Sequence, residues 1–133
     1  MRHVILASHH SFAEGLRDTL EFIGGIKDIK VICAYMNDVS LTDQVKEVFS
    51  NIKSNDEVLI LTDILQGSVT QALTPYMQEN CFLVAGVNVP CALELALCKS
   101  PLTVEKIRHI ISIARDSIQL VNSYKVDISD DDE

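Results

Sequence analysis

The sequence predicts one α/β domain in which a doubly wound, mainly parallel sheet of four strands carries helices on both faces. Four short apolar runs are continuous rather than alternating, which is typical of strands buried on both faces. Segments with helical periodicity separate these runs, so strand and helix alternate along the chain. The chain has 133 residues, of which 47% are hydrophobic. This is enough to build a single core without disulfides or a metal.

The expected strands cover residues 4–7, 29–34, 58–61 and 82–87. Apolar residues at helical spacing predict helices over residues 12–23, 41–52, 68–78, 90–98 and 107–121. Two of these helices begin with a pattern that fits the capping box, Ser11 with Glu14 and Ser68 with Gln71. In that motif the hydroxyl and the carboxylate or amide bind free backbone N–H groups at the helix start.

The C-terminal part of the chain predicts a helix, a short strand and a tail. Ser100 before Pro101 predicts a cap ahead of an early-helix proline for the last helix. Residues 123–128 alternate polar and apolar, which indicates a short edge strand. Five of the last seven residues are acidic, so we expect a solvated end. The expected organisation is a domain over residues 1–128 and an acidic tail over residues 129–133.

Charge and hydropathy exclude several classes of protein. The net charge is −8 and no basic stripe is present, so nucleic-acid binding is disfavoured. The apolar runs are far shorter than the ~20 residues that span a bilayer, and no signal peptide opens the chain. We therefore expect a soluble, cytoplasmic domain without membrane insertion. The four cysteines form no Cys-x-x-Cys pair, so we expect reduced structural thiols and no metal site.

Polar residues follow the first expected strand, where an open α/β sheet binds its ligands. His9 and His10 stand there, directly before a helix. Imidazole is nucleophilic and largely neutral near pH 7. The helix N-terminus favours an anion beside it, which suits a phosphohistidine and disfavours an imidazolium. The alternative is that the pair forms a polar surface turn. His3 and His109 are expected to be structural or solvated.

The third expected strand ends in a second group of candidates. Asp63 can hold one ring nitrogen of a histidine by a hydrogen bond, which fixes the tautomer and leaves the other nitrogen free. An Asx-turn or a loop cap is the alternative for Asp63. Ser68 can cap a helix and offer its hydroxyl to a phosphate, and Gly67 lets the backbone approach a bound anion. The segment lacks the Gly-x-x-x-x-Gly-Lys-Ser/Thr motif of a P-loop.

Three blocks, taken together, resemble a known family. They are VILASHHSFAEGL over residues 4–16, LILTDILQGS over residues 59–68 and AGVNVP over residues 85–90, followed by Leu93 and Glu94. In this order they resemble the enzyme IIA component (EIIA) of the mannose/fructose/sorbose family of the bacterial phosphoenolpyruvate-dependent sugar phosphotransferase system (PTS). The expected fold matches that family over nearly the whole chain.

The resemblance implies a phosphotransferase that acts through a phosphohistidine intermediate. His9, rather than His10, aligns with the phosphorylated residue, Asp63 with the carboxylate that orients the ring, and Ser68 with the hydroxyl near the phosphate. The family takes phosphate from the phosphocarrier protein HPr and passes it to a IIB component that serves a membrane permease, and this scheme requires neither metal nor cofactor. The family is typically a homodimer that exchanges its C-terminal strand, which residues 123–128 would supply.

The sequence departs from the family pattern in two places. His10 stands where a small residue, usually Gly, follows the active histidine, and Gln66 begins a Gln-Gly-Ser-Val segment where the family usually has Gly-Gly-Ser-Pro. The second difference removes a Gly and a Pro beside the site, and it bears on loop geometry and partner specificity more than on the chemistry. Two alternatives stay open: the phosphotransfer subunit of dihydroxyacetone kinase, and a non-transporting regulatory domain that a partner reads by its phosphorylation state.

Overall fold

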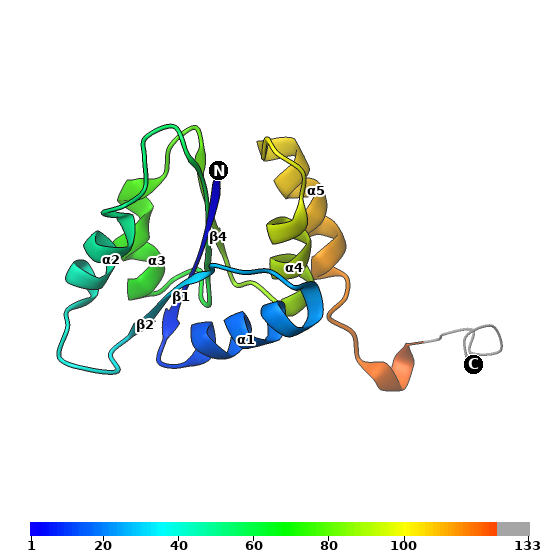
Figure 1. The fold of residues 1–133 in the computed structure, drawn as a ribbon. Helices are drawn as coiled ribbons and strands as arrows, with labels where there is room; N and C mark the ends of the chain where they lie inside the picture. Colours follow the sequence, from blue (N-terminus) through cyan, green and yellow to red (C-terminus); the bar gives the residue numbers. More distant parts are fainter. Residues whose placement is uncertain (125–133) are drawn as a thin grey trace.

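The computed structural model describes residues 1–124, which form a three-layer α/β domain (Figure 1). Its strands are β1 (Arg2–His9), β2 (Lys30–Ala34), β3 (Glu57–Thr62) and β4 (Cys81–Ala85). Its helices are α1 (Phe12–Gly24), α2 (Leu41–Phe49), α3 (Ser68–Leu73), α4 (Val89–Leu97) and α5 (Val104–Arg115). Two short 3-10 turns, η1 (Thr74–Tyr76) and η2 (Val121–Ser123), complete the described part.

The four strands form one parallel sheet in the order β2-β1-β3-β4. Helices α1, α4 and α5 cover one face, and α2 and α3 cover the other (Figure 1). Neighbouring residues of β1 therefore enter different cores: Leu6 packs with α1 and α4, whereas Ile5 packs with α2 and α3. Both side chains are fully buried. The apolar runs in the sequence are continuous because successive residues of a strand are buried on both faces of the sheet. The predicted fold class is confirmed.

The helix starts differ from the predicted caps. The hydroxyl of Ser11 makes no capping bond. The buried Oγ of Ser8 instead accepts the backbone N–H of Ala13 at 2.7 Å. Ser68 is the first residue of α3, and Gly67 occupies the cap position without a side chain. The hydroxyl of Thr103 caps the last helix, so the prediction from Ser100 and Pro101 was wrong as well.

The loop that carries Ser100 is held by a charged cluster at the amino ends of the strands. The carboxylate of Glu57 accepts hydrogen bonds from Arg2 Nε at 2.6 Å, from the Ser100 hydroxyl at 3.0 Å and from the backbone N–H of Leu102 at 2.6 Å. Arg2 also donates to backbone carbonyls at the end of α4. Ser100 therefore binds this cluster and not a helix N-terminus.

The two largest differences in helix length are at the ends of α3 and α5, which stop at Leu73 and Arg115 and not at residues 78 and 121. Pro75 follows α3 and has no N–H group to continue the helical hydrogen bonds, so the chain turns into η1. Helix α5 ends at Arg115, and next to this end the carbonyl of Ala114 accepts hydrogen bonds from the side chains of Asn88 and Ser117. The segment after α5 leaves the body of the domain (Figure 1), and Ile118 is 74% exposed.

The remaining C-terminal predictions lie largely outside the described residues. Ser123 belongs to η2 and not to a strand, and residues 125–128 of the expected strand lie beyond residue 124. The expected tail over residues 129–133 lies there too. Within residues 1–124, no helix is long and apolar enough to cross a bilayer.

The cysteines of the structure are free thiols. Burial raises the pKa of Cys81 to about 11 and also raises the pKa of Cys91. Both side chains are therefore neutral thiols that pack as small apolar groups on opposite faces of the sheet. Residues 1–124 contain no cluster of three His, Cys, Asp or Glu side chains that could hold a metal ion.

Candidate active site

His9 and Asp63 come together at the carboxyl ends of two neighbouring strands. Ala7 of β1 pairs with Thr62 of β3, so the residues that follow them meet at the same edge of the sheet. The Oδ2 atom of Asp63 accepts two hydrogen bonds from His9, one from the backbone N–H at 2.9 Å and one from ring Nδ1 at 3.0 Å. The His9 side chain is 34% exposed, and the Asp63 side chain is 13% exposed.

The electrostatics of this pair define which ring nitrogen can react. Burial of Asp63 opposes ionisation, but the hydrogen bonds from the backbone and ring of His9 outweigh it and hold the pKa of Asp63 below its ordinary value. A carboxylate beside Nδ1 retains the proton there, so Nε2 keeps the free lone pair. Within residues 1–124, Nε2 makes no hydrogen bond and Asp63 Oδ1 is buried without a partner.

Gly67 lies against the imidazole of His9. A Cβ atom at this position would stand 3.2 Å from His9 Cε1, closer than most real contacts. The glycine therefore lets the loop after β3 pass beside the ring. The shape of that loop is fixed by Thr70, whose Oγ1 donates to the carbonyl of Ile64 at 2.6 Å and contacts Thr62 Oγ1 at 2.7 Å.

Ser68 is held by a residue that the sequence reasoning missed. Its Oγ lies 2.5 Å from the hydroxyl of Tyr35, which directly follows β2. The ring of Tyr35 lies with its centroid 5.8 Å from that of His9, at an angle of 42°. The sequence did contain a signal for Tyr35. Candidate residues were selected after the first, third and fourth strands, because ligands bind at the carboxyl ends of the strands, and the same rule applied to β2 selects Tyr35.

His10 contributes its backbone to the site. It has a φ of +53°, its N–H donates to the carbonyl of Ala34 at 2.9 Å, and its own carbonyl accepts the Ser8 hydroxyl. The bond from His10 to Ala34 joins the end of β1 to the end of β2. The bond from Ser8 to His10 lies within the turn that follows β1. The other two histidines lie elsewhere: His3 is buried at the amino end of β1 against Asp56, and His109 is exposed on α5.

The third sequence block is structural in this fold. Gly86 has a φ of +73°, a conformation that glycine adopts without strain. Its N–H and that of Val87 both bind the carbonyl of Thr62, next to Asp63. The side chain of Asn88 caps α4 through the N–H of Cys91 and donates to the carbonyl of Ala114 in α5. This block thus braces the end of β3.

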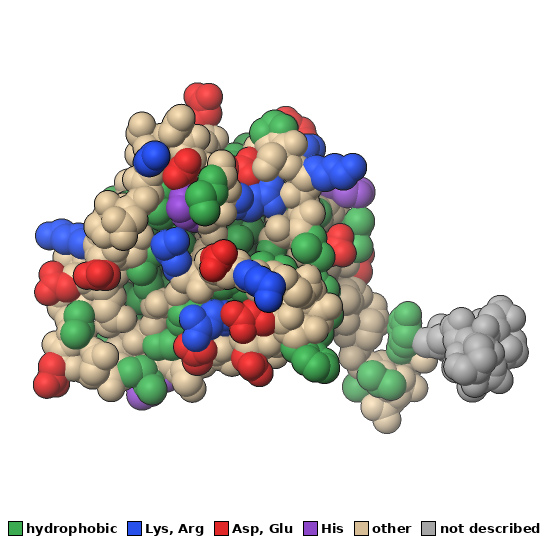
Figure 2. Space-filling model, viewed as in Figure 1, with side chains coloured by type: hydrophobic (Ala, Val, Ile, Leu, Met, Phe, Trp, Pro, Cys, Tyr) green, Lys and Arg blue, Asp and Glu red, His purple; other side chains and the backbone are tan. Residues whose placement is uncertain are grey.

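Exposed apolar side chains occupy the same edge of the sheet as His9. They follow β1, β2 and β3 and are 48–69% exposed: Phe12, Tyr35, Met36, Val39, Ile64 and Leu65. Figure 2 shows a histidine with hydrophobic side chains near it at the lower edge of the molecule, where β1 ends in Figure 1. The site is thus an open surface with apolar surroundings.

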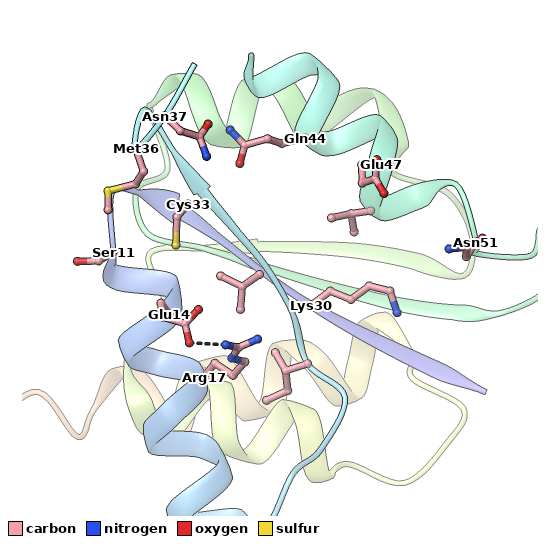
Figure 3. A pocket seen from close by; sticks show the side chains of 13 residues that line it. Ser11, Glu14, Arg17, Lys30, Cys33, Met36, Asn37, Gln44, Glu47 and Asn51 are labelled. Atoms are coloured by element: carbon pink, nitrogen blue, oxygen red, sulfur yellow. Dashed lines mark hydrogen bonds and ion pairs between the residues drawn. The ribbon is translucent and has the colours of Figure 1, made fainter. Parts of the chain in front are cut away.

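A groove of about 640 Å³ runs from this surface along the edge strand β2, between α1 and α2. Ser11 and Met36 lie at the end next to the site, and Lys30 lies toward the other end (Figure 3). The ion pair between Glu14 and Arg17 stands on the α1 side (Figure 3). His9 does not line the groove.

Comparison with known proteins gives a consistent result. The family model described as PTS system fructose IIA component matches residues 3–112. A structure from Klebsiella pneumoniae, described as a phosphoenolpyruvate-dependent sugar phosphotransferase system permease, is 35% identical, with 92% of each chain covered and a TM-score of 0.83. The search of curated proteins finds no match.

Two further structures share the fold. The mannose/sorbose-specific IIA subunit from Enterococcus faecalis is 20% identical, with 94% of this chain and 98% of that chain covered and a TM-score of 0.77. Phosphotransferase system component EIIA from Streptococcus agalactiae is 22% identical, with coverages of 93% and 100% and a TM-score of 0.72.

Proposed function

Because the chain belongs to the family of PTS fructose IIA components, we propose that it is a phosphoryl carrier whose acceptor is His9. It takes the phosphoryl group from phospho-HPr and passes it to a IIB component, in the cytoplasm, for sugar uptake and phosphorylation. The observation that carries the proposal is the double hydrogen bond from His9 to Asp63. That contact fixes the ring and its tautomer and leaves Nε2 free on an open surface.

The transfer is a displacement at phosphorus. The lone pair of His9 Nε2 attacks the phosphoryl group of phospho-HPr in line, and the P–N bond of the donor breaks with its electron pair returning to the donor imidazole. The new P–N bond leaves positive charge on the His9 ring, because Nδ1 keeps its proton. The Asp63 carboxylate, 3.0 Å from Nδ1, offsets that charge. Transfer to IIB is the same step in reverse, with the IIB nucleophile attacking phosphorus.

Ser68 and Gly67 have supporting roles in this scheme. The Ser68 hydroxyl donates to a phosphoryl oxygen, and Gly67 gives the phosphoryl group room beside the ring. The loose transition state of phosphoryl transfer needs positioning and charge stabilisation more than covalent help. The proposal therefore assigns neither a metal nor a cofactor to the reaction.

The surroundings of His9 suit a macromolecular donor and acceptor. His9 stands on an open surface with exposed apolar residues in the segments that follow β1, β2 and β3, including Phe12 at the start of α1, Met36 and Leu65. Contiguous exposed apolar side chains mark protein–protein contact surfaces. HPr and IIB would dock there in turn. A homodimer is also proposed for this chain, on the family resemblance alone.

Phosphorylation of the wild type and two variants tests the proposal. Wild type, His9→Ala and His10→Ala are incubated with phosphoenolpyruvate, enzyme I and HPr, and intact mass is measured under alkaline conditions. We expect an acid-labile phosphate on wild type and on His10→Ala and none on His9→Ala. Labelled wild type is then mixed with a cognate IIB component, which should receive the phosphate. Phosphate on His9→Ala, or its absence from wild type, would contradict the proposal.

A further inference from the structure

Tyr35 occupies an unfavourable backbone conformation beside the site. Its φ is +69°, in the left-handed region that bulky residues avoid. His10, which follows the neighbouring strand, has a φ of +53°. The two positions are coupled, because the N–H of His10 donates to the carbonyl of Ala34, the residue before Tyr35. Strained residues persist where the surrounding structure holds them, and they cluster at functional sites.

The side chain of Tyr35 connects two parts of the site. Its ring lies 5.8 Å from the His9 ring, and its hydroxyl lies 2.5 Å from Ser68 Oγ. Tyr35 is nevertheless 52% exposed, so burial of its ring does not account for its position. A tyrosine that is half in solvent and strained in its backbone is held here by these two contacts.

The contacts join two hydroxyl groups, one of them on a ring that neighbours the His9 imidazole. A Cβ atom at position 67 would stand 3.2 Å from His9 Cε1, the ring atom that is bonded to both nitrogens. Ser68 is the next residue in the chain, and its hydroxyl is the group to which the proposed function assigns a phosphoryl oxygen. The Tyr35 hydroxyl contacts that group directly. Each hydroxyl can donate one hydrogen bond, and a phosphoryl group offers several acceptor oxygens.

We propose that Tyr35 binds the phosphoryl group on His9. Its ring packs against the imidazole, and its hydroxyl exchanges the bond to Ser68 for a bond to a phosphoryl oxygen, while Ser68 donates to another. This inference rests on the proposed function, because it requires a phosphoryl group on His9. The hydroxyl pair holds itself in place in the unphosphorylated protein, so both donors are positioned before the group arrives.

The variant Tyr35→Phe isolates the hydroxyl, since it keeps the ring and the side-chain shape. Tyr124→Phe is the matched control, because Tyr124 is 53% exposed and lies on the segment after α5. The rate of phosphoryl transfer is measured over a range of phospho-HPr concentrations. Tyr35→Phe should lower the rate at saturation roughly tenfold or more, as loss of a donor to a developing oxyanion does, with the concentration at half-saturation nearly unchanged.

A second measurement separates this inference from the carrier function. Wild type and both variants are phosphorylated with phosphoramidate, a small phosphoryl donor that needs no protein partner, and the lifetime of phospho-His9 is followed by phosphorus NMR. We expect a shorter lifetime and a shifted resonance for Tyr35→Phe alone, with equal thermal unfolding midpoints. Rates and lifetimes within twofold of wild type would overturn the role of Tyr35 and leave the carrier function intact. Failure of wild type to accept phosphate from either donor would overturn both.

Discussion

Replacement of Asp63 by Asn should slow phosphoryl transfer while preserving the geometry of the site. A single carboxylate oxygen, Oδ2, accepts both hydrogen bonds from His9. An Asn whose carbonyl oxygen occupies that place keeps both bonds, and its amide nitrogen occupies the place of Oδ1. The change therefore removes the charge and little else. What is lost is the stabilisation of positive charge on the imidazole as the new P–N bond forms.

The expected magnitude follows from the difference between charged and neutral hydrogen bonds. Hydrogen bonds to charged groups contribute about 1–2 kcal/mol more than neutral ones. Applied to the barrier, this corresponds to a rate lower by about 5- to 30-fold. Oδ1 is buried and makes no hydrogen bond within residues 1–124, so the substitution replaces one unpartnered group by another. The free energy of unfolding should therefore change by no more than about 1–3 kcal/mol, the cost of one unsatisfied polar group.

The assay is rapid mixing of radiolabelled phospho-HPr with the variant, quenched in alkali because phosphohistidine is acid-labile. Asp56→Asn is the matched control, since Asp56 Oδ2 contacts His3 Nε2 at 2.8 Å in a similar pair at the opposite end of β1. The control should transfer phosphate at the wild-type rate. The reasoning is refuted if Asp63→Asn stays within twofold of wild type, or if both Asn variants slow transfer equally.

Two further substitutions test the site and the charged cluster. Gly67→Ala has an extended backbone to occupy, with φ −150°, but its Cβ would stand 3.2 Å from His9 Cε1. Gly67→Ala should therefore slow transfer several-fold, because the new methyl group displaces the His9 ring. Gly15→Ala is the control, since a Cβ at Gly15 would meet nothing within 4 Å, and it should leave the rate unchanged. Equal rates for the two variants in the same mixing assay would contradict the role of Gly67. Burial of Glu57 opposes its ionisation, but the Leu102 N–H and Arg2 outweigh it and hold its pKa below the ordinary 4.5. Stability from Glu57 is therefore present above about pH 4.5 and lost as the pH falls below it. The midpoint of thermal unfolding, measured between pH 3 and 7, should depend less on pH in Glu57→Gln than in the wild type. The same pH dependence in both proteins would argue against a stabilising role of the Glu57 carboxylate.

The sheet was predictable because burial on both faces leaves a plain signal in the sequence. Strands with cores on both sides, such as the one containing Ile5 and Leu6, must be apolar at successive positions. The pairing of His9 with Asp63 followed as well, since parallel strands end at the same edge. In contrast, the length of α5 was overestimated, because Ile118 continues the apolar pattern beyond the point where Asn88 takes the carbonyl of Ala114.

The helix caps and Tyr35 were missed for a related reason. The hydroxyl of Ser8 caps α1 from a position outside the local pattern, through a turn that has His10 in a left-handed conformation. The contact of Tyr35 with Ser68 joins residues 33 positions apart in the chain. Capping patterns describe residues close together in sequence, so they predict neither of these contacts.

The position of His9 at the end of an inner strand of the sheet has a consequence for the proposed function over many cycles. β1 is bonded to a strand on each side, and such strands open last in native-state hydrogen exchange, close to the free energy of global unfolding. The amides of β1 should therefore be among the slowest to exchange, in both the free and the phosphorylated protein. A histidine at the end of such a strand stands on a rigid backbone. In the proposed mechanism, His9 therefore does not have to be ordered again for each transfer. The rearrangement that brings phosphorus into line then falls to the proteins proposed to dock against it.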